Sequence, residues 1–137
     1  MTFKKQYQEN KKLYNRLTES EKVFFINDPY SVPVIHSAKE EAFKETQRLF
    51  GVNGHNDLSD AFRHCYFAAM LSRDLGYYES LDYLNAHENS PDNPVREKRM
   101  DTQNNYIGAD IGRTQKRNSE LSAMCAQAAQ GGKLALY

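Results

Sequence analysis

The sequence predicts a single all-α domain of six or seven helices. Apolar residues recur at helical spacing along most of the chain, and no pair of segments shows the alternation typical of strands. The 137 residues, 39% hydrophobic and 12% aromatic, are enough to build one compact core. No repeat or linker divides them, so we expect one domain over 1–137, with 1–30 as an N-terminal helical extension and 31–132 as the helical core.

The N-terminal third is expected to form three helices. Thr18 and Glu21 have the spacing of a capping box, which starts the second helix, and the residue before Pro29 disfavours its continuation. Residues 31–35 are expected to be extended, with Pro33 near the start of the third helix, which stops at Gly51. The first two helices are expected over about 3–17 and 18–26, and the third carries the apolar residues from Ala38 to Phe50.

Four more helices are expected after loops that contain Gly, Pro and Asn. Asp57 or Ser59 caps the fourth helix, and Asn118 or Ser119 caps the seventh. The last residues, 133–137, are expected to be either extended and docked or frayed. The expected bounds are about 58–75, 77–87, 95–114 and 118–130.

The fourth predicted helix carries apolar residues in nearly every direction, which is typical of a central buried helix. Its first two turns nevertheless carry Asp57, Asp60, Arg63 and His64. Asp60 and His64 are four residues apart and therefore share one face. The polar cluster is expected at one end of a buried helix.

Two further polar clusters accompany apolar helices. His87 and Glu88 close the fifth helix, while Asp101, Asn105, Gly108 and Gly112 form one stripe on the sixth, with Asn104 beside it. Because Gly costs about 1 kcal/mol relative to Ala inside a helix, the two glycines indicate close approach of another backbone. We expect this stripe to pack against the fourth helix, so that Asp101 and Asn105 face His64 and Asp60.

Histidines and carboxylates together can support general acid–base or metal-assisted chemistry. Oxygen-rich ligands favour Ca²⁺, Mg²⁺ or Mn²⁺, whereas two or three imidazoles favour Zn²⁺. The leading hypothesis is a hydrolase with a divalent metal, acting on a phosphoester or lipid-linked substrate. Its expected residues are His64, Asp60, His87 and Glu88 for catalysis, Arg63, Asn104 and Asn105 for substrate binding, and Asp57, Asp60, His64 and Asp101 for the metal.

Two other hypotheses remain open at this stage. In one, the polar residues form a buried structural network in a non-catalytic module. The other, a pore former or membrane-surface protein, is disfavoured because no long apolar or strongly basic amphipathic helix is evident. Cys65 and Cys125 fit neither a disulfide framework nor a zinc motif and are expected to be buried apolar residues.

Composition excludes some functions. The 18 basic and 18 acidic residues balance, whereas a dedicated nucleic-acid-binding domain is usually basic, so no such surface is expected. No apolar run approaches the roughly 18 residues that suggest a transmembrane segment. The basic N-terminus is followed by no apolar segment, so we expect no signal peptide.

Three strings carry a resemblance: His55 to Phe67 with D-A-F-R-H, Ala86 to Glu88 with H-E, and Met100 to Gly108 with M-D-x-x-N-N-x-x-G. Over about 33–113 they resemble a poorly characterised family of bacterial polymorphic-toxin C-terminal domains, although Phe67 stands where that family is expected to have Trp. The resemblance implies an interbacterial toxin, made in the cytoplasm and exported by a specialised secretion system, with a cognate immunity protein as its partner. The resemblance does not identify the reaction that the domain would catalyse.

Overall fold

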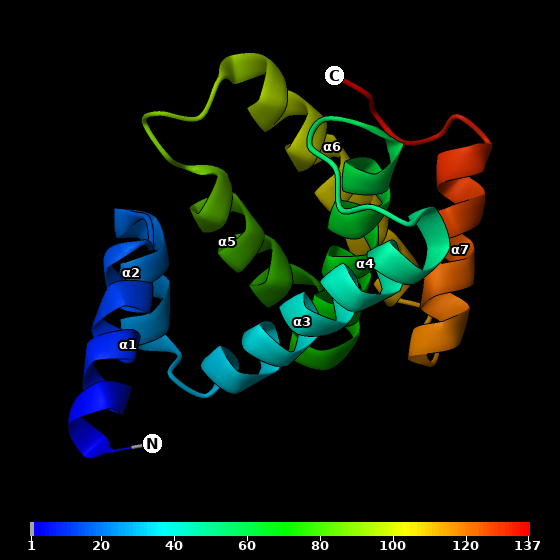
Figure 1. Cartoon of the computed structure of the whole chain (residues 1–137). Coiled ribbons are helices and arrows are strands. Elements are labelled where there is room, and N and C mark those ends of the chain that lie inside the picture. Colours follow the sequence, from blue (N-terminus) through cyan, green and yellow to red (C-terminus); the bar gives the residue numbers. More distant parts are fainter. Residues whose placement is uncertain (1) are drawn as a thin grey trace.

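The computed structural model describes residues 2–137, and within that range it contains seven α-helices and no strand (Figure 1). This confirms the predicted all-α class. None of these helices is long and apolar enough to cross a membrane. The helices are α1 Phe3–Asn15, α2 Glu19–Asn27, α3 Ser31–Phe50, α4 Leu58–Leu75, α5 Tyr77–Glu88, α6 Val95–Gly112 and α7 Asn118–Gln130.

Helix α4 is the centre of the fold, as its apolar circumference predicts. It packs against α3, α5, α6 and α7, which surround it in Figure 1. The side chains of Phe62, Cys65, Tyr66 and Leu71 are fully buried. Cys125 on α7 is also fully buried and its sulfur contacts that of Cys65, so the expectation of two buried cysteines is confirmed.

The α4–α6 interface depends on two glycines. A Cβ atom at Gly108 would overlap the carbonyl oxygen of Cys65, and one at Gly112 would overlap that of Ala69. Both glycines are buried, and Ser72 Oγ reaches across to donate to the carbonyl of Ala109 at 2.7 Å. The predicted close approach of these backbones is confirmed.

The helix starts differ from expectation in two places. Residues 31–35 are helical rather than extended, because Pro33 lies in the first turn, where a missing N–H breaks no helical hydrogen bond. Ser31 Oγ donates to the Asp28 carbonyl at 2.7 Å, at this start. Helix α7 follows Arg117 with no side-chain cap, so neither predicted cap residue has that role.

Residues 133–137 are docked on the helices rather than frayed, which were the two alternatives for this segment. Leu134 is buried, and Asn104 on α6 makes two hydrogen bonds with the backbone of Ala135. Its amide nitrogen donates to the carbonyl at 2.9 Å, and its amide oxygen accepts from the N–H at 2.7 Å. Asn104 therefore serves to hold the segment that follows α7.

Helix α2 is attached to α5 by a buried carboxylate. The capping box of Thr18 and Glu21 is present, and the second carboxylate oxygen of Glu21 accepts a hydrogen bond from Tyr83 Oη at 3.1 Å. His87 Nδ1 lies 3.1 Å from the same oxygen. Burial alone would raise the pKa of Glu21, but the interaction with His87, aided by Thr18 and Tyr83, lowers it.

We expect Glu21→Gln to destabilise the protein by about 1–3 kcal/mol at pH 5.5, because a buried charged acceptor is lost. The lowered pKa means that ionised Glu21 stabilises the fold above its unfolded pKa of about 4.3, and that this stabilisation disappears as pH falls through the lower folded value. The difference in unfolding free energy between wild type and variant should therefore become smaller from pH 5.5 to pH 3. Urea unfolding at each pH measures it.

The control for this prediction is Glu19→Gln, an exposed glutamate on the same helix that makes a surface ion pair with Lys22. It should change the unfolding free energy little at any pH. If Glu21→Gln lowers the unfolding free energy by the same amount at pH 3 as at pH 5.5, the charge of the carboxylate does not contribute to stability.

Candidate functional site

Four predicted residues from three helices surround His64. His64 Nε2 lies 3.4 Å from Asp60 Oδ1 and 3.4 Å from Asp101 Oδ1. Its Nδ1 lies 3.3 Å from the amide oxygen of Asn105 and 4.0 Å from Glu88 Oε1. The structure thus brings together α4, α5 and α6 at one end of the central helix, as the stripe on α6 predicts.

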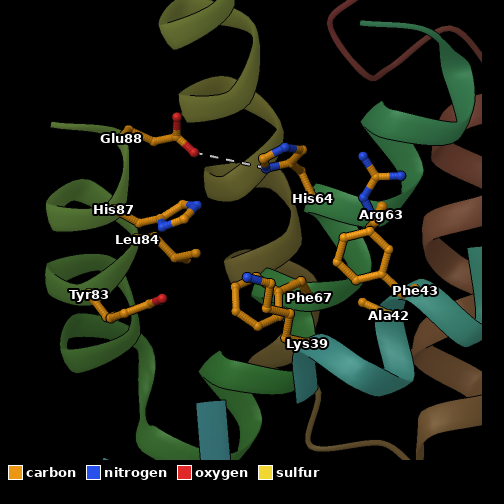
Figure 2. A pocket seen from close by; sticks show the side chains of 10 residues that line it. All are labelled: Lys39, Ala42, Phe43, Arg63, His64, Phe67, Tyr83, Leu84, His87 and Glu88. Carbon is orange, nitrogen blue, oxygen red and sulfur yellow. Dashed lines mark ion pairs between the residues drawn. The ribbon is translucent and has the colours of Figure 1, made fainter. Parts of the chain in front are cut away.

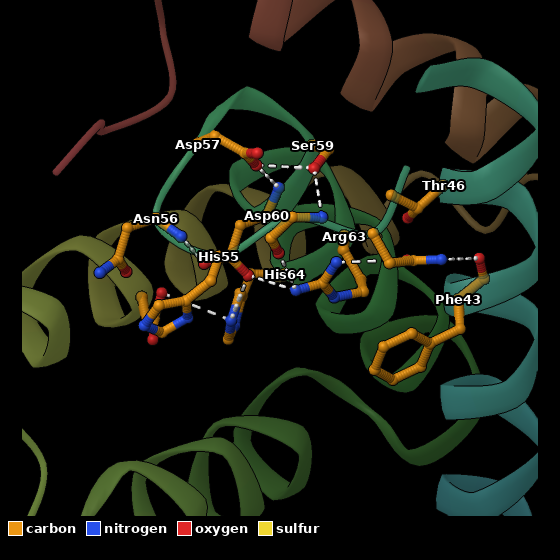
Figure 3. A network of polar contacts seen from close by, with 12 residues as sticks. Phe43, Thr46, His55, Asn56, Asp57, Ser59, Asp60, Arg63 and His64 are labelled. Carbon is orange, nitrogen blue, oxygen red and sulfur yellow. Dashed lines mark hydrogen bonds and ion pairs between the residues drawn. The ribbon is translucent and has the colours of Figure 1, made fainter. Parts of the chain in front are cut away.

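The loop before α4 fixes the position of Asp60. Asp57 caps the helix and accepts the N–H of Asp60 at 3.0 Å, while Asp60 Oδ2 accepts the N–H of Asn56 at 2.7 Å (Figure 3). Arg63 donates to Asp60 Oδ1 at 2.6 Å and to the carbonyl of Gly54 at 3.0 Å. Both carboxylate oxygens of Asp60 are therefore held before any ligand arrives.

The centre has an excess of negative charge. The carboxylates of Asp60, Glu88 and Asp101 surround one imidazole, and burial together with Glu88 and Asp60 raises the pKa of Asp101 to about 6. Burial would lower the pKa of His64, but its hydrogen bond to Asp60 and the charge of Asp101 raise it. Burial would likewise raise the pKa of Asp60, yet His64, Asn56 and Arg63 lower it.

Two carboxylate oxygens in this cluster accept no hydrogen bond. They are Glu88 Oε1 and Asp101 Oδ1, both sealed from solvent, and the Glu88 side chain is only 5% exposed. A buried carboxylate oxygen without a donor is costly, so such atoms indicate a ligand that the protein binds. Both oxygens lie near His64.

Asp60, His64 and Asp101 could together hold a metal ion. One ligand atom from each lies within 4.8 Å of the others, and the two distances to His64 Nε2 are 3.4 Å. Ligands bound at about 2.1 Å in tetrahedral geometry are about 3.4 Å apart, which agrees with both distances. The donor set, two carboxylates and one imidazole, suits a divalent cation.

A pocket of about 200 Å³ opens beside His64, between α5 on one side and α3 and α4 on the other (Figure 2). His64 contributes an imidazole and Glu88 a carboxylate to the pocket wall, and most of the remaining wall is apolar. The lining residues are Lys39, Ala42, Phe43, Arg63, His64, Phe67, Tyr83, Leu84, His87 and Glu88.

The remaining predicted residues have other partners. Asp57, expected as a metal ligand, has its Oδ1 occupied by the Asp60 N–H and the Ser59 hydroxyl, and Asn104, expected to bind substrate, holds the chain end. We therefore exclude Asp57 and Asn104 from the candidate site. His87 lines the pocket but pairs with Glu21 rather than His64.

Sequence reasoning missed several residues around the pocket. Lys39 and Phe43 are exposed residues of α3; nothing in the sequence distinguishes Lys39 from ordinary surface, and Phe43 is recognisable only as an apolar residue of that helix. Glu97 had a detectable signal, because it precedes Asp101 by one helical turn. It binds the loop before α4, accepting from Asn56 Nδ2 at 2.8 Å and lying 3.2 Å from His55 Nε2.

The comparisons with known proteins identify a family and no activity. No curated protein matches the chain, and no solved structure does. Residues 22–133 match a family described as a domain of unknown function, DUF6973. That match includes α3 to α7 and every residue of the candidate site. The chain therefore belongs to the DUF6973 family.

Proposed function

We propose that this protein is a metal-assisted hydrolase that cleaves phosphoester bonds, with lipid-linked phosphoesters as its preferred substrates. One observation carries the proposal: Asp60, His64 and Asp101 converge at ligand spacing beside a pocket, with an unpartnered buried carboxylate oxygen on Asp101 and another on Glu88. A divalent cation would neutralise the excess carboxylate charge of this cluster.

The residues around the ion would have separate roles. If His64 Nδ1–H donates to the amide oxygen of Asn105, the Nε2 lone pair is free to bind the ion beside Asp60 and Asp101. A bound Zn²⁺, Mn²⁺, Mg²⁺ or Ca²⁺ would polarise a phosphoryl oxygen and acidify a water molecule. Glu88, which lines the pocket and whose Oε1 lies 4.0 Å from His64 Nδ1, would act as the general base.

The rest of the pocket supports an anionic substrate with an apolar group. Phe43, Phe67, Tyr83 and Leu84 supply apolar wall. Lys39 lies on the same wall and forms no ion pair with any residue in 2–137, so its ammonium group is available to a phosphate. A phosphoester with an attached hydrocarbon group satisfies both features.

The biological setting is part of the same proposal. The three motif strings that resemble polymorphic-toxin domains supply the polar centre, since His64, Glu88 and Asp101 each come from a different string. We therefore propose that the hydrolase acts as an interbacterial toxin, exported by a specialised secretion system and neutralised in the producing bacterium by an immunity protein.

A structural network is the second candidate function, and the contacts of Arg63 favour it. Arg63 donates to Asp60, to the Asn53 amide oxygen at 3.2 Å and to the Gly54 carbonyl, and so ties the loop before α4 to the helix. On this hypothesis the whole cluster stabilises the fold and binds no ligand.

Asp101→Asn separates the two candidates. A metal site predicts that the variant binds Mn²⁺ or Zn²⁺ at least tenfold more weakly and loses hydrolysis of bis(p-nitrophenyl) phosphate. It also predicts unchanged or higher stability without metal, because the neutral amide relieves repulsion from Glu88 and Asp60. Isothermal titration calorimetry and thermal melts measure these effects.

Asp110→Asn is the matched control, since Asp110 is an exposed aspartate on the same helix. It should leave metal affinity, hydrolysis and melting temperature unchanged. A wild-type protein that binds neither ion, combined with a clear loss of stability in Asp101→Asn, would establish the structural network and overturn the hydrolase.

A further inference from the structure

Helix α1 projects an aromatic stripe into solvent. Phe3, Tyr7 and Tyr14 follow one another at separations of four and seven residues, which is about one and two helical turns and places them on one face. Their exposed fractions are 98%, 64% and 48%. No residue of α1 is buried; within residues 2–137, Lys22 on α2 lies over the Tyr14 ring at 4.9 Å, while Phe3 and Tyr7 are exposed.

The rest of α1 is basic, unlike the chain as a whole. Helix α1 has four basic residues and one acidic residue, although the sequence as a whole has no net charge. Lys4 and Lys11 are seven residues apart, about two helical turns, so both lie beside the aromatic stripe, where they can reach anionic groups next to it. Aromatic and basic residues in this arrangement are typical of helices that lie in a membrane interface.

The position of α1 leaves it free to bind a surface. Together with α2 it lies at the end of the molecule opposite α7, and α2 connects it to α5, which forms one wall of the pocket (Figure 1). A helix of 13 residues is only marginally stable in water, so burial of its apolar face would also stabilise its helical form.

We propose that α1 is an interfacial helix that docks the protein on an anionic lipid bilayer, with Phe3, Tyr7 and Tyr14 in the headgroup region and the flanking lysines on acidic headgroups. The charge of the helix selects this occupant over a second copy of the chain, because two α1 helices would repel each other. The sequence alone disfavours a membrane-surface protein because no long apolar or strongly basic amphipathic helix is evident; the exposure of the aromatic stripe of α1 in the fold is the new observation. The inference does not depend on the proposed hydrolysis, since docking requires no reaction.

Vesicle flotation tests this inference. The whole protein should float with phosphatidylglycerol vesicles and not with phosphatidylcholine vesicles, and Lys4→Gln/Lys11→Gln should weaken the association about tenfold or more. Phe3→Ser/Tyr7→Ser should weaken it comparably, without changing the melting temperature, because both side chains are exposed.

Two control pairs change exposed residues elsewhere. Lys98→Gln/Arg99→Gln removes the same charge from α6, and Tyr78→Ser/Val95→Ser removes exposed apolar area from α5 and α6. Both pairs should float as the wild type does. No flotation with either vesicle, an equal loss in the controls, or concentration-dependent dimerisation through α1 would overturn the inference.

Discussion

Replacement of Gly108 by alanine is expected to destabilise the protein by about 1–3 kcal/mol, as overpacking typically does. The same change in an ordinary helix stabilises it by about 1 kcal/mol, so the expected effect has the opposite sign. The reason is that the new methyl group would overlap the carbonyl oxygen of Cys65, and backbone cannot rotate away as a flexible side chain can. Urea unfolding measures the change.

Gly108→Ala should also disturb the geometry of the candidate site. A wider α4–α6 separation would move Asp101 and Asn105 away from His64, so metal affinity should fall along with stability. Gln103→Ala is the control, because Gln103 is exposed on α6 and gains helix propensity without a clash. A Gly108→Ala variant as stable as wild type would contradict the close packing and the placement of Asp101 that follows from it.

Loss of the imidazole of His64 should abolish hydrolysis while the fold survives. We expect His64→Ala to lower kcat/KM at least 100-fold, because His64 contacts both carboxylates of the proposed metal site. The accompanying loss of stability should be about 1–3 kcal/mol, the cost of removing one partner from a buried polar network. Activity assays and thermal melts on the same preparation measure both.

His87→Ala is the informative comparison for His64. His87 lines the pocket, but its Nδ1 faces Glu21 and its side chain is 42% exposed, so its replacement should reduce activity far less. It should instead loosen α2 from α5. Equal losses of activity in the two variants would place His87 in the reaction, and equal activity in all three proteins would remove His64 from it.

The parts of the fold that sequence predicts correctly have a local signal. The apolar circumference of α4 predicts its central position, and the spacing of Gly108 and Gly112 predicts which face of α6 approaches it. Since Asp101 belongs to the same stripe, its approach to His64 follows from helical periodicity alone. Long, strongly periodic helices are where such reasoning works best.

Other features depend on partners that are distant in the sequence. Nothing near Asn104 indicates that its amide binds Ala135, 31 residues later, rather than a substrate. Asp57 is ambiguous because one carboxylate can cap a helix or bind a metal, and only the fold shows that Ser59 and Asp60 occupy it. The extended conformation expected near Pro33 is wrong because proline is tolerated in a first helical turn, where the sequence does not reveal the helix start.

The central position of α4 also determines how the protein can open. Helices α3, α5, α6 and α7 pack against α4, so the amide protons of its buried middle turns should exchange with solvent only when the whole core unfolds. Helix α2 packs mainly against α5, and no residue of α1 is buried. These two helices can therefore detach in a separate local opening that requires less free energy than unfolding of the core. The N-terminal helices can therefore bind, release or reorient while Asp60, His64 and Asp101, on α4 and α6, stay assembled.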